Sequence, residues 1–212
     1  MSQNATLRKI LEAVYKMAVR KRKANESRPE GEKYAELQRV RLGSRLLAYL
    51  PLRVTDELVG ILREFKEKAS AIGVSQFYIQ THFQSPLEVT PEARHAIEAI
   101  LAAGWTITNQ LVYTVSASRK GHTAKLRQTL NALGVVCYYT FSVKGFLENY
   151  AVYTPNSRSL QEAREEKIFG QVPEEKQAEL YDMIRNQRPL GKRLVRFLKE
   201  TGCCSQVRIV MY

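Results

Sequence analysis

A unit of helix, glycine and short apolar run is repeated three times in the middle of the chain. The glycines are Gly73, Gly104 and Gly134, at intervals of 31 and 30 residues. Each precedes an apolar run typical of a buried strand, at 74–79, 105–107 and 135–139. This regular alternation predicts parallel strands joined by crossover helices. Parallel sheets are usually covered on both faces, so we expect the same here.

Apolar residues at helical spacing predict the helices around these strands. Thr55 is suited to begin a helix that extends to about Ala71, and Thr90, followed by Pro91, is suited to begin the next. The three glycines fit the left-handed position that ends a helix. Further helices are expected at 7–19, 123–133, 158–169 and 173–184, and a short strand is expected at 46–50.

Four strand candidates, at 47–50, 74–80, 105–113 and 135–141, are too few for a complete eight-stranded barrel. The expected fold class is α/β, with parallel strands that form either half of a barrel or a small open sheet. We divide the chain into an N-terminal helix with a basic linker (1–33), a partial (β/α) barrel (34–170) and a basic helical tail (171–212). Exposed edges of a half barrel invite pairing, so a covering segment is expected.

Polar residues follow each apolar run, at the end of parallel strands where binding sites form. They are Gln80-Thr81-His82, Thr108-Asn109-Gln110, and Ser142 with Lys144. His82 fits a ligand contact or proton carrier, or else a hydrogen-bonded loop histidine, and its spacing alone favours the loop histidine. Asn109 and Gln110 are expected to point to opposite faces of the sheet. They either bind a ligand or tie neighbouring strands together.

Other motifs give weaker signals. The loop from Ser116 to His122 has the small and basic residues of an anion site before a helix, without the glycine spacing of a phosphate loop. Lys144 fits either a partner for a substrate anion or a solvated loop residue. No residue set has the pattern of a nucleophile with its base and acid, of a dinucleotide fingerprint or of a Walker loop. The three cysteines, Cys137, Cys203 and Cys204, lack metal-ligand spacing.

The net charge of +12 is concentrated in two flanks. Residues 8–53 carry 13 Lys and Arg against 5 Glu, and residues 185–208 carry 7 against 1. Basic flanks bind polyanions or serve as solvated helix faces, and we favour solvated faces, so nucleic acid is not an expected partner. No apolar stretch approaches the roughly 20 residues that span a bilayer. We therefore expect a cytoplasmic protein without a membrane segment.

The segment from Arg39 to Gly170 resembles the lysine 2,3-aminomutase family of radical S-adenosylmethionine enzymes. The resemblance rests on an ordered set of short stretches that spans over half the chain. They are Arg41-Leu-Gly-Ser-Arg45 with Leu50-Pro51 and Arg53-Val-Thr55, Gln80-Thr-His-Phe83 with Pro86 and Glu88-Val-Thr90, Ala103-Gly104 through Asn109-Gln110, and Gly134 through Tyr138-Tyr139. The resemblance implies a partial (β/α) barrel that holds a 4Fe-4S cluster, S-adenosylmethionine and pyridoxal phosphate. Together these move an amino group between adjacent carbons of an amino acid.

By resemblance, His82, Asn109 and Gln110 are expected to face the cofactors, and Tyr139 and Lys144 to lie near the substrate. A lysine at 144 suits an acidic or neutral side chain rather than an ammonium. By resemblance to glutamate-specific members, which carry a lysine there, a glutamate-like amino acid is the preferred substrate. No catalytic residue is assigned. The family's Cys-x-x-x-Cys-x-x-Cys motif and its aldimine-forming lysine segment are absent from this sequence. The cluster is therefore not expected to bind this chain alone.

These departures lead to the hypothesis of a truncated or split aminomutase, inactive alone, whose barrel is completed by a missing N-terminal segment or a second copy. One alternative is a nucleic-acid-binding module that uses the basic flanks. Another is a non-enzymatic subunit that completes the barrel of a different chain.

Overall fold

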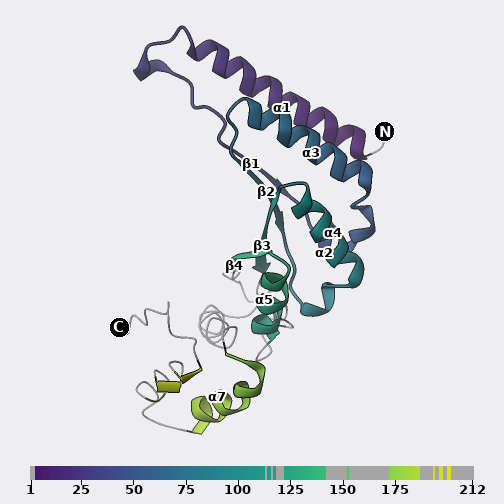
Figure 1. Cartoon of the computed structure of the whole chain (residues 1–212), viewed down its shortest axis with the longest axis vertical. Helices are drawn as coiled ribbons and strands as arrows, with labels where there is room; N and C mark the ends of the chain where they lie inside the picture. The colour runs from purple at the N-terminus through teal and green to yellow at the C-terminus, as the bar shows by residue number, and fades with distance from the viewer. Residues whose placement is uncertain are drawn as a thin grey trace.

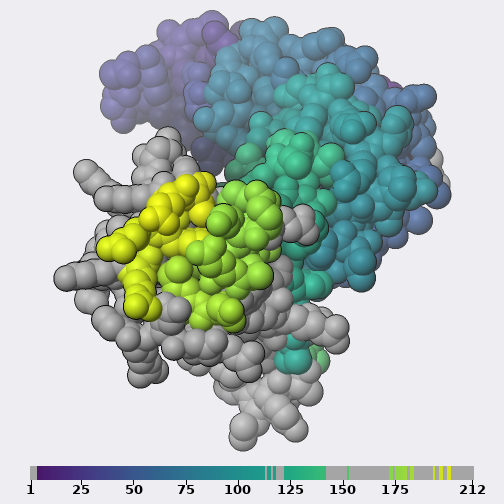
Figure 2. All heavy atoms as spheres, turned by 60° about the horizontal axis from the view of Figure 1, so that its bottom comes forward, coloured from purple at the N-terminus to yellow at the C-terminus, as the bar shows by residue number. Residues whose placement is uncertain are grey.

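The computed structural model of the chain describes residues 3–112, 114–115, 117, 122–141, 152, 172–186, 193, 196–197 and 200–201. Figure 1 shows α1 and α3 side by side at one end, with α7 at the opposite end, and Figure 2 shows α7 in green at the front and α1 in purple at the back. In chain order the elements are α1 (Gln3–Asn25), η1 (Glu30–Glu32), β1 (Arg39–Gly43), α2 (Leu46–Tyr49), η2 (Pro51–Arg53), α3 (Asp56–Ala71), β2 (Gln76–Thr81), η3 (Pro86–Glu88), α4 (Pro91–Ala102), β3 (Thr106–Val112), α5 (His122–Ala132), β4 (Val136–Phe141) and α7 (Glu174–Asn186).

The four described strands form one sheet in the order β1-β2-β3-β4, and every neighbouring pair is parallel. The predicted α/β fold with parallel strands is therefore confirmed. The register aligns Leu42 of β1 with Ile79 of β2 and Ile79 with Ile107 of β3. Because side chains at one register level point to the same face, these three apolar residues share a face. Within the described residues the sheet does not close into a barrel.

The hydrophobic core lies between one face of this sheet and the helices. Trp105 is 1% exposed, and its indole Nε1 donates to the carbonyl of Leu62 in α3 at 3.0 Å. Phe65 and Phe77 contact the indole, with ring centroids 6.2 and 5.4 Å away. In Figure 1, α2, α3 and α4 lie along the same side of the strands. The core thus joins β2 and β3 to α3 and α4.

No helix of the described ranges packs on the opposite face of the sheet. Along β1 and β2 exposed or half-buried residues alternate with more buried ones, and the more exposed set, such as Arg41 and Tyr78, is on this face. In Figure 1 no labelled helix lies on that side of β1 and β2. The expectation that both faces are covered therefore does not hold for the described residues. We call this the helix-free face, and the other the helix-covered face.

The predicted helix ends are confirmed. Gly73, Gly104 and Gly134 have φ values of 89°, 80° and 81° and are the residues of positive φ in the described part of the chain. The side chain of Thr55 accepts from the Leu58 amide, as expected for the start of a helix. The side chain of Thr90 likewise accepts from the Ala93 amide at the start of α4, where Pro91 is the first helical residue. These local signals set the lengths of the repeated units.

The predicted strand at 46–50 is wrong. Residues Leu46–Tyr49 form the short helix α2, and the strand lies earlier, at Arg39–Gly43. A short apolar run has no period of its own, so pattern alone does not separate helix from strand. The predicted helix at 158–169 lies outside the described residues, and the division at 33 and 170 stays a prediction. None of the helices in the described ranges is long and apolar enough to cross a bilayer.

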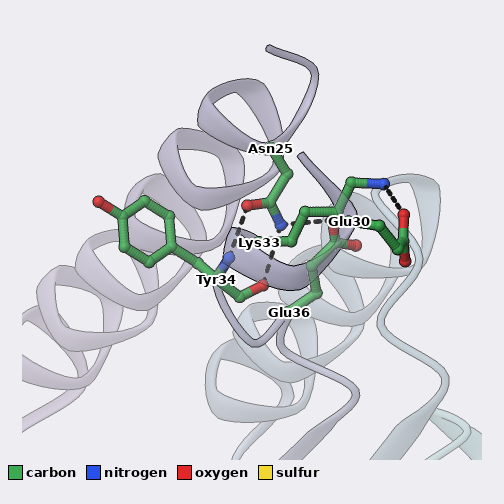
Figure 3. A network of polar contacts seen from close by, with 5 residues as sticks. All are labelled: Asn25, Glu30, Lys33, Tyr34 and Glu36. Carbon is green, nitrogen blue, oxygen red and sulfur yellow. Dashed lines mark hydrogen bonds and ion pairs between the residues drawn. The ribbon is translucent and has the colours of Figure 1, made fainter. Parts of the chain in front are cut away.

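A polar network fixes the loop that leads from α1 to β1 (Figure 3). Asn25, the last residue of α1, is buried, and its side chain bonds both the amide and the carbonyl of Tyr34, at 2.8 and 2.9 Å. It also donates to the Glu36 carboxylate at 3.0 Å. Lys33 and Glu30 pair at 2.7 Å on the exposed side of the loop. This network fixes the chain on its way into β1.

Candidate functional site

The helix-free face contains an open hollow of about 690 Å³. Its lining residues come from all four strands, and most of them carry polar groups: Arg39, Arg41, Tyr78, Gln80, Thr106, Thr108, Val136 and Tyr138. Barrel interiors are usually packed with branched apolar side chains. The polar lining therefore indicates a surface that is hydrated or binds a polar ligand.

Three of the predicted polar residues meet at the carboxyl ends of β2 and β3. The side-chain amide of Gln80 donates to the side-chain oxygen of Gln110. The ring Nδ1 of His82 lies 3.1 Å from the Gln110 carbonyl oxygen. A carbonyl oxygen only accepts, so this contact requires the proton on Nδ1 and leaves Nε2 of a neutral ring as an acceptor. His82 and Gln110 thus form one polar corner beside the hollow.

Asn109 lies on the helix-covered face and is 3% exposed. Its Oδ1 accepts from the Phe83 amide at 2.7 Å, and its Nδ2 donates to the Phe83 carbonyl at 3.1 Å. These two bonds resemble a strand pairing and fix the loop after β2. Asn109 therefore positions the chain next to His82, while its neighbour Gln110 faces the hollow side.

Tyr139 lies beside Gln110 in register, after an irregularity in β4. Asn109 aligns with Cys137, whereas Gln110 aligns with Tyr139, so β4 has one extra residue at this level. A bulge of this kind re-aims the side chains that follow it. Tyr138 and Tyr139 are 65% and 55% exposed, and their ring centroids are 6.5 Å apart. The bulge thus gives β4 two adjacent exposed tyrosines.

Two predicted features fall wholly or mostly outside the described residues. Lys144 lies outside them, so its expected place near the substrate is untested. Of the predicted anion loop, the structure describes Ala117 and His122, and His122 begins α5.

Sequence reasoning missed most of the hollow. Arg39 and Arg41 alternate with Val40 and Leu42, which is the pattern of a half-buried strand. The sequence contains this pattern at Arg39–Leu42, but the strand was predicted at 46–50 instead. Tyr78 and Thr106 were counted within apolar runs, where alternation between the two faces was not resolved, whereas Gln80 and Thr108 were among the polar residues expected at the strand ends.

Charge on the sheet has one sign. The four strands contain two arginines and no Asp or Glu. Within the described ranges, no group of three or more His, Cys, Asp or Glu side chains is placed to hold a metal ion. Cys137 is a half-buried cysteine on β4. The site described here consists of amides, hydroxyls, an imidazole and guanidinium groups.

Comparison with known proteins agrees with the resemblance in the sequence, although no family model matches. An uncharacterised KamA family protein of Methanocaldococcus jannaschii is 35% identical over 127 residues, which are 60% of this chain and 19% of that protein. A putative L-lysine 2,3-aminomutase of Aquifex aeolicus is 34% identical over 55% of this chain and 31% of its own length.

A glutamate 2,3-aminomutase of Clostridioides difficile is 34% identical over 106 residues, or 50% of this chain and 23% of the enzyme. The chain therefore matches between a fifth and a third of the length of these relatives. Over half or more of its own length, this chain is similar to one part of the lysine 2,3-aminomutase (KamA) family.

Proposed function

We propose that this chain contributes part of a (β/α) barrel to a radical S-adenosylmethionine 2,3-aminomutase, and that it does not catalyse alone. The observations that carry the proposal are the match of half or more of the chain to KamA-family and aminomutase proteins and a sheet that is polar on its helix-free face. In a (β/α) barrel the helices lie outside and the strands' other face lines the interior. The helix-free face corresponds to that interior.

The corner made by His82 and Gln110 is the proposed cofactor contact. His82 presents a ring nitrogen beside the hollow, and Gln110 is paired with Gln80 across β2 and β3. Asn109, also expected near the cofactors, acts through its two bonds to Phe83 and holds the His82 loop in place. Tyr139, next to Gln110 in register, is the proposed substrate contact on β4.

The proposed substrate is an amino acid with an acidic side chain. This rests on Lys144, whose ammonium group attracts a carboxylate and repels the ammonium of lysine. A relative of this chain is a glutamate 2,3-aminomutase, whereas others are lysine 2,3-aminomutases. Lysine is the alternative substrate, and the choice depends on residue 144.

The family's three cofactors fit this chain unequally. The described residues hold one cysteine, Cys137, and the sequence lacks three cysteines at cluster spacing, so the 4Fe-4S cluster does not fit here. S-adenosylmethionine and pyridoxal phosphate together supply radical amino-group migration in that family, and the amide and imidazole corner suits their polar groups. We therefore propose that a separate segment brings the cluster-binding cysteines.

Reconstitution tests this proposal. The chain is produced anaerobically with the part of the Clostridioides difficile glutamate 2,3-aminomutase that precedes the matched region, with iron, sulfide, S-adenosylmethionine and pyridoxal phosphate. We expect conversion of L-glutamate to its 3-amino isomer only when both segments are present, and its loss with Gln110→Ala. Asn131→Ala, an exposed change on α5, is the matched control. Turnover by this chain alone, or none from an iron-loaded, co-purified pair, would contradict the proposal.

Substrate choice is tested in the same system by Lys144→Asp. Reversing the charge should lower glutamate turnover and favour lysine, because the attraction to the substrate side chain changes sign. An unchanged ratio of the two activities would remove Lys144 from the substrate site.

A further inference from the structure

The apolar surface of α1 is wider than its contact with α3. Leu11 is buried where α1 packs along α3, and Figure 1 shows the two helices side by side. Val14 is half-buried and still packs against the core. Ile10 and Met17 lie about 40–60° further round the helix, at about 100° per residue, and are 53% and 43% exposed. An apolar strip therefore extends from the α3 contact onto the exposed side of α1.

The exposed residues of this strip repeat at the spacing of a seam between two helices. Ile10, Ala13 and Met17 are separated by three and then four residues, and all three are exposed. Thr6 and Arg20 continue the spacing at either end with polar side chains, so the apolar part is roughly two turns long. We call Ile10, Ala13 and Met17 the outer stripe of α1. Its length and spacing suit contact with one further helix.

A row of lysines borders the outer stripe. Lys9, Lys16 and Lys23 are exposed and lie seven residues apart, so they line one side of the stripe. In paired helices, charges at such bordering positions meet the partner and decide which partner is accepted. Lys16 pairs with Glu12 at 3.5 Å, but both side chains are largely exposed, and pairs of this kind are weak. Glu12 is the one acidic residue of α1, against seven Lys and Arg, so the border is strongly basic.

This combination of seam and charge distinguishes between possible partners. Two copies of α1 would bring two basic helices together, and like charges repel. A membrane surface requires a broad apolar face, whereas the outer stripe has two large apolar side chains and one alanine. Nucleic acid would pair with the lysines and leave the apolar seam uncovered. An amphipathic helix with acidic borders complements both the seam and the lysine row.

We propose that the outer stripe of α1 docks an acidic amphipathic helix of another protein chain. The apolar side chains of that helix pack on Ile10 and Met17, and the small side chain of Ala13 allows the two backbones to approach. Glutamates beside its apolar positions pair with the lysine row. The docking surface lies on the helix layer and not on the helix-free face. The proposal is therefore independent of the proposed function and of its test.

Binding of two labelled peptides to the purified full chain, measured by fluorescence anisotropy, tests this surface. Each peptide is three heptads long with leucine at both seam positions. One has glutamate and the other lysine at the bordering positions. We expect the glutamate peptide to bind at least about tenfold more tightly than the lysine peptide, because its charges attract the lysine row.

Substitutions on α1 locate the bound peptide. Met17→Glu places a charge in the seam and should weaken binding of the glutamate peptide by about tenfold or more. Lys16→Glu reverses one bordering charge and should weaken it by about fivefold. Lys125→Glu, the same change at an exposed position of α5, is the matched control and should have little effect. Unfolding midpoints measured by circular dichroism show whether each variant keeps its fold.

Several results would overturn the proposal. Equal binding of the two peptides, or none by the glutamate peptide, would mean that the lysine row does not select an acidic helix. Unchanged binding by Met17→Glu at an equal unfolding midpoint would place the peptide elsewhere on the chain. A dimer in sedimentation that Met17→Glu dissociates would make a second copy the occupant. Tighter binding to anionic lipid vesicles or to a ten-nucleotide single strand, weakened by Lys16→Glu, would indicate a surface for polyanions instead.

Discussion

The two faces of this sheet differ in what their side chains do. On the helix-covered face, Ile79, Ile107 and Trp105, which directly precedes β3, are each at most 6% exposed, and the indole nitrogen is hydrogen-bonded. On the helix-free face, Arg41 and Tyr138 are exposed and the lining is polar. The same strands supply both sets, because successive residues of a strand point to opposite faces. One face therefore stabilises the fold, and the other is available for binding.

This difference explains why the two faces tolerate change unequally. Burial stabilises a protein by roughly 25 cal/mol per Å² of apolar surface, and the helix-covered face holds most of that surface here. The helix-free face contributes little burial, so substitutions there are expected to alter binding more than folding. The following predictions test this separation, from the largest expected effect to the smallest.

Truncating the central tryptophan should give the largest loss of stability. Trp105→Ala removes the contacts to Phe65 and Phe77 and the bond to Leu62, and should cost about 3–5 kcal/mol. Tyr138→Ala on the helix-free face should change the free energy of unfolding by less than about 0.5 kcal/mol. Urea unfolding followed by circular dichroism measures both. Comparable losses for the two variants would mean that the faces do not differ in this way.

Substitutions of the adjacent residues Asn109 and Gln110 should differ in the same way in their effect on stability. Asn109→Ala leaves the amide and carbonyl of Phe83 buried without their partners, which should cost about 1–3 kcal/mol. Gln110→Ala, whose side chain pairs with Gln80 on the partly open face, should cost less than half as much. Thermal and urea unfolding of the pair provide the measurement. A larger loss for Gln110→Ala would reverse the roles given to the two residues.

Thr81 offers a test in the stabilising direction. Its hydroxyl is buried on the helix-covered face and has no hydrogen-bond partner within the described part of the chain. Thr81→Val keeps the shape and removes the unpaired hydroxyl, so stability should rise by up to about 1 kcal/mol. Denaturant midpoints at equal slope measure the change. A clear destabilisation would show that the hydroxyl of Thr81 has a hydrogen-bond partner.

The smallest expected effect is on the pH dependence of stability, through an ion pair between α1 and α3. Hydrogen bonds from Lys68 and then Arg8 lower the pKa of Glu64, which joins α3 to α1. A lowered folded-state pKa gives stability that is present above the unfolded value near 4.5 and is lost as pH falls through the folded value. Glu64→Gln should reduce the loss of stability in that acidic range. An identical acid profile for wild type and variant would show that this exposed bridge contributes nothing.

The sequence predicted those elements that local chemistry defines. Thr55, Thr90 and the three positive-φ glycines mark helix ends through capping and backbone conformation, and both effects act within a few residues. Strand β1 was missed because its apolar residues alternate with arginines. The strand was predicted instead at a more apolar run nearby. That run, Leu46–Tyr49, forms a helix because tertiary packing decides short segments.

The candidate site was predicted only where polar residues interrupt an apolar strand. His82 and Gln110 were identified at the strand ends, and the structure brings them together through the Gln110 carbonyl. The arginines of the hollow and Thr106 were not identified, because their common location depends on the register between strands. Register is a property of the sheet, and no single strand contains that information.

The most direct test of the central claim is hydrogen–deuterium exchange of the chain alone and with the cysteine-bearing segment used for reconstitution. If the helix-free face is a barrel interior completed by that segment, amides of β1 should exchange more slowly in the pair. Amides of β3, already bonded to β2 and β4, should change little. Slower exchange confined to α3 and α4 in a co-purified pair would contradict the account, because the contact would then lie on the helix-covered side.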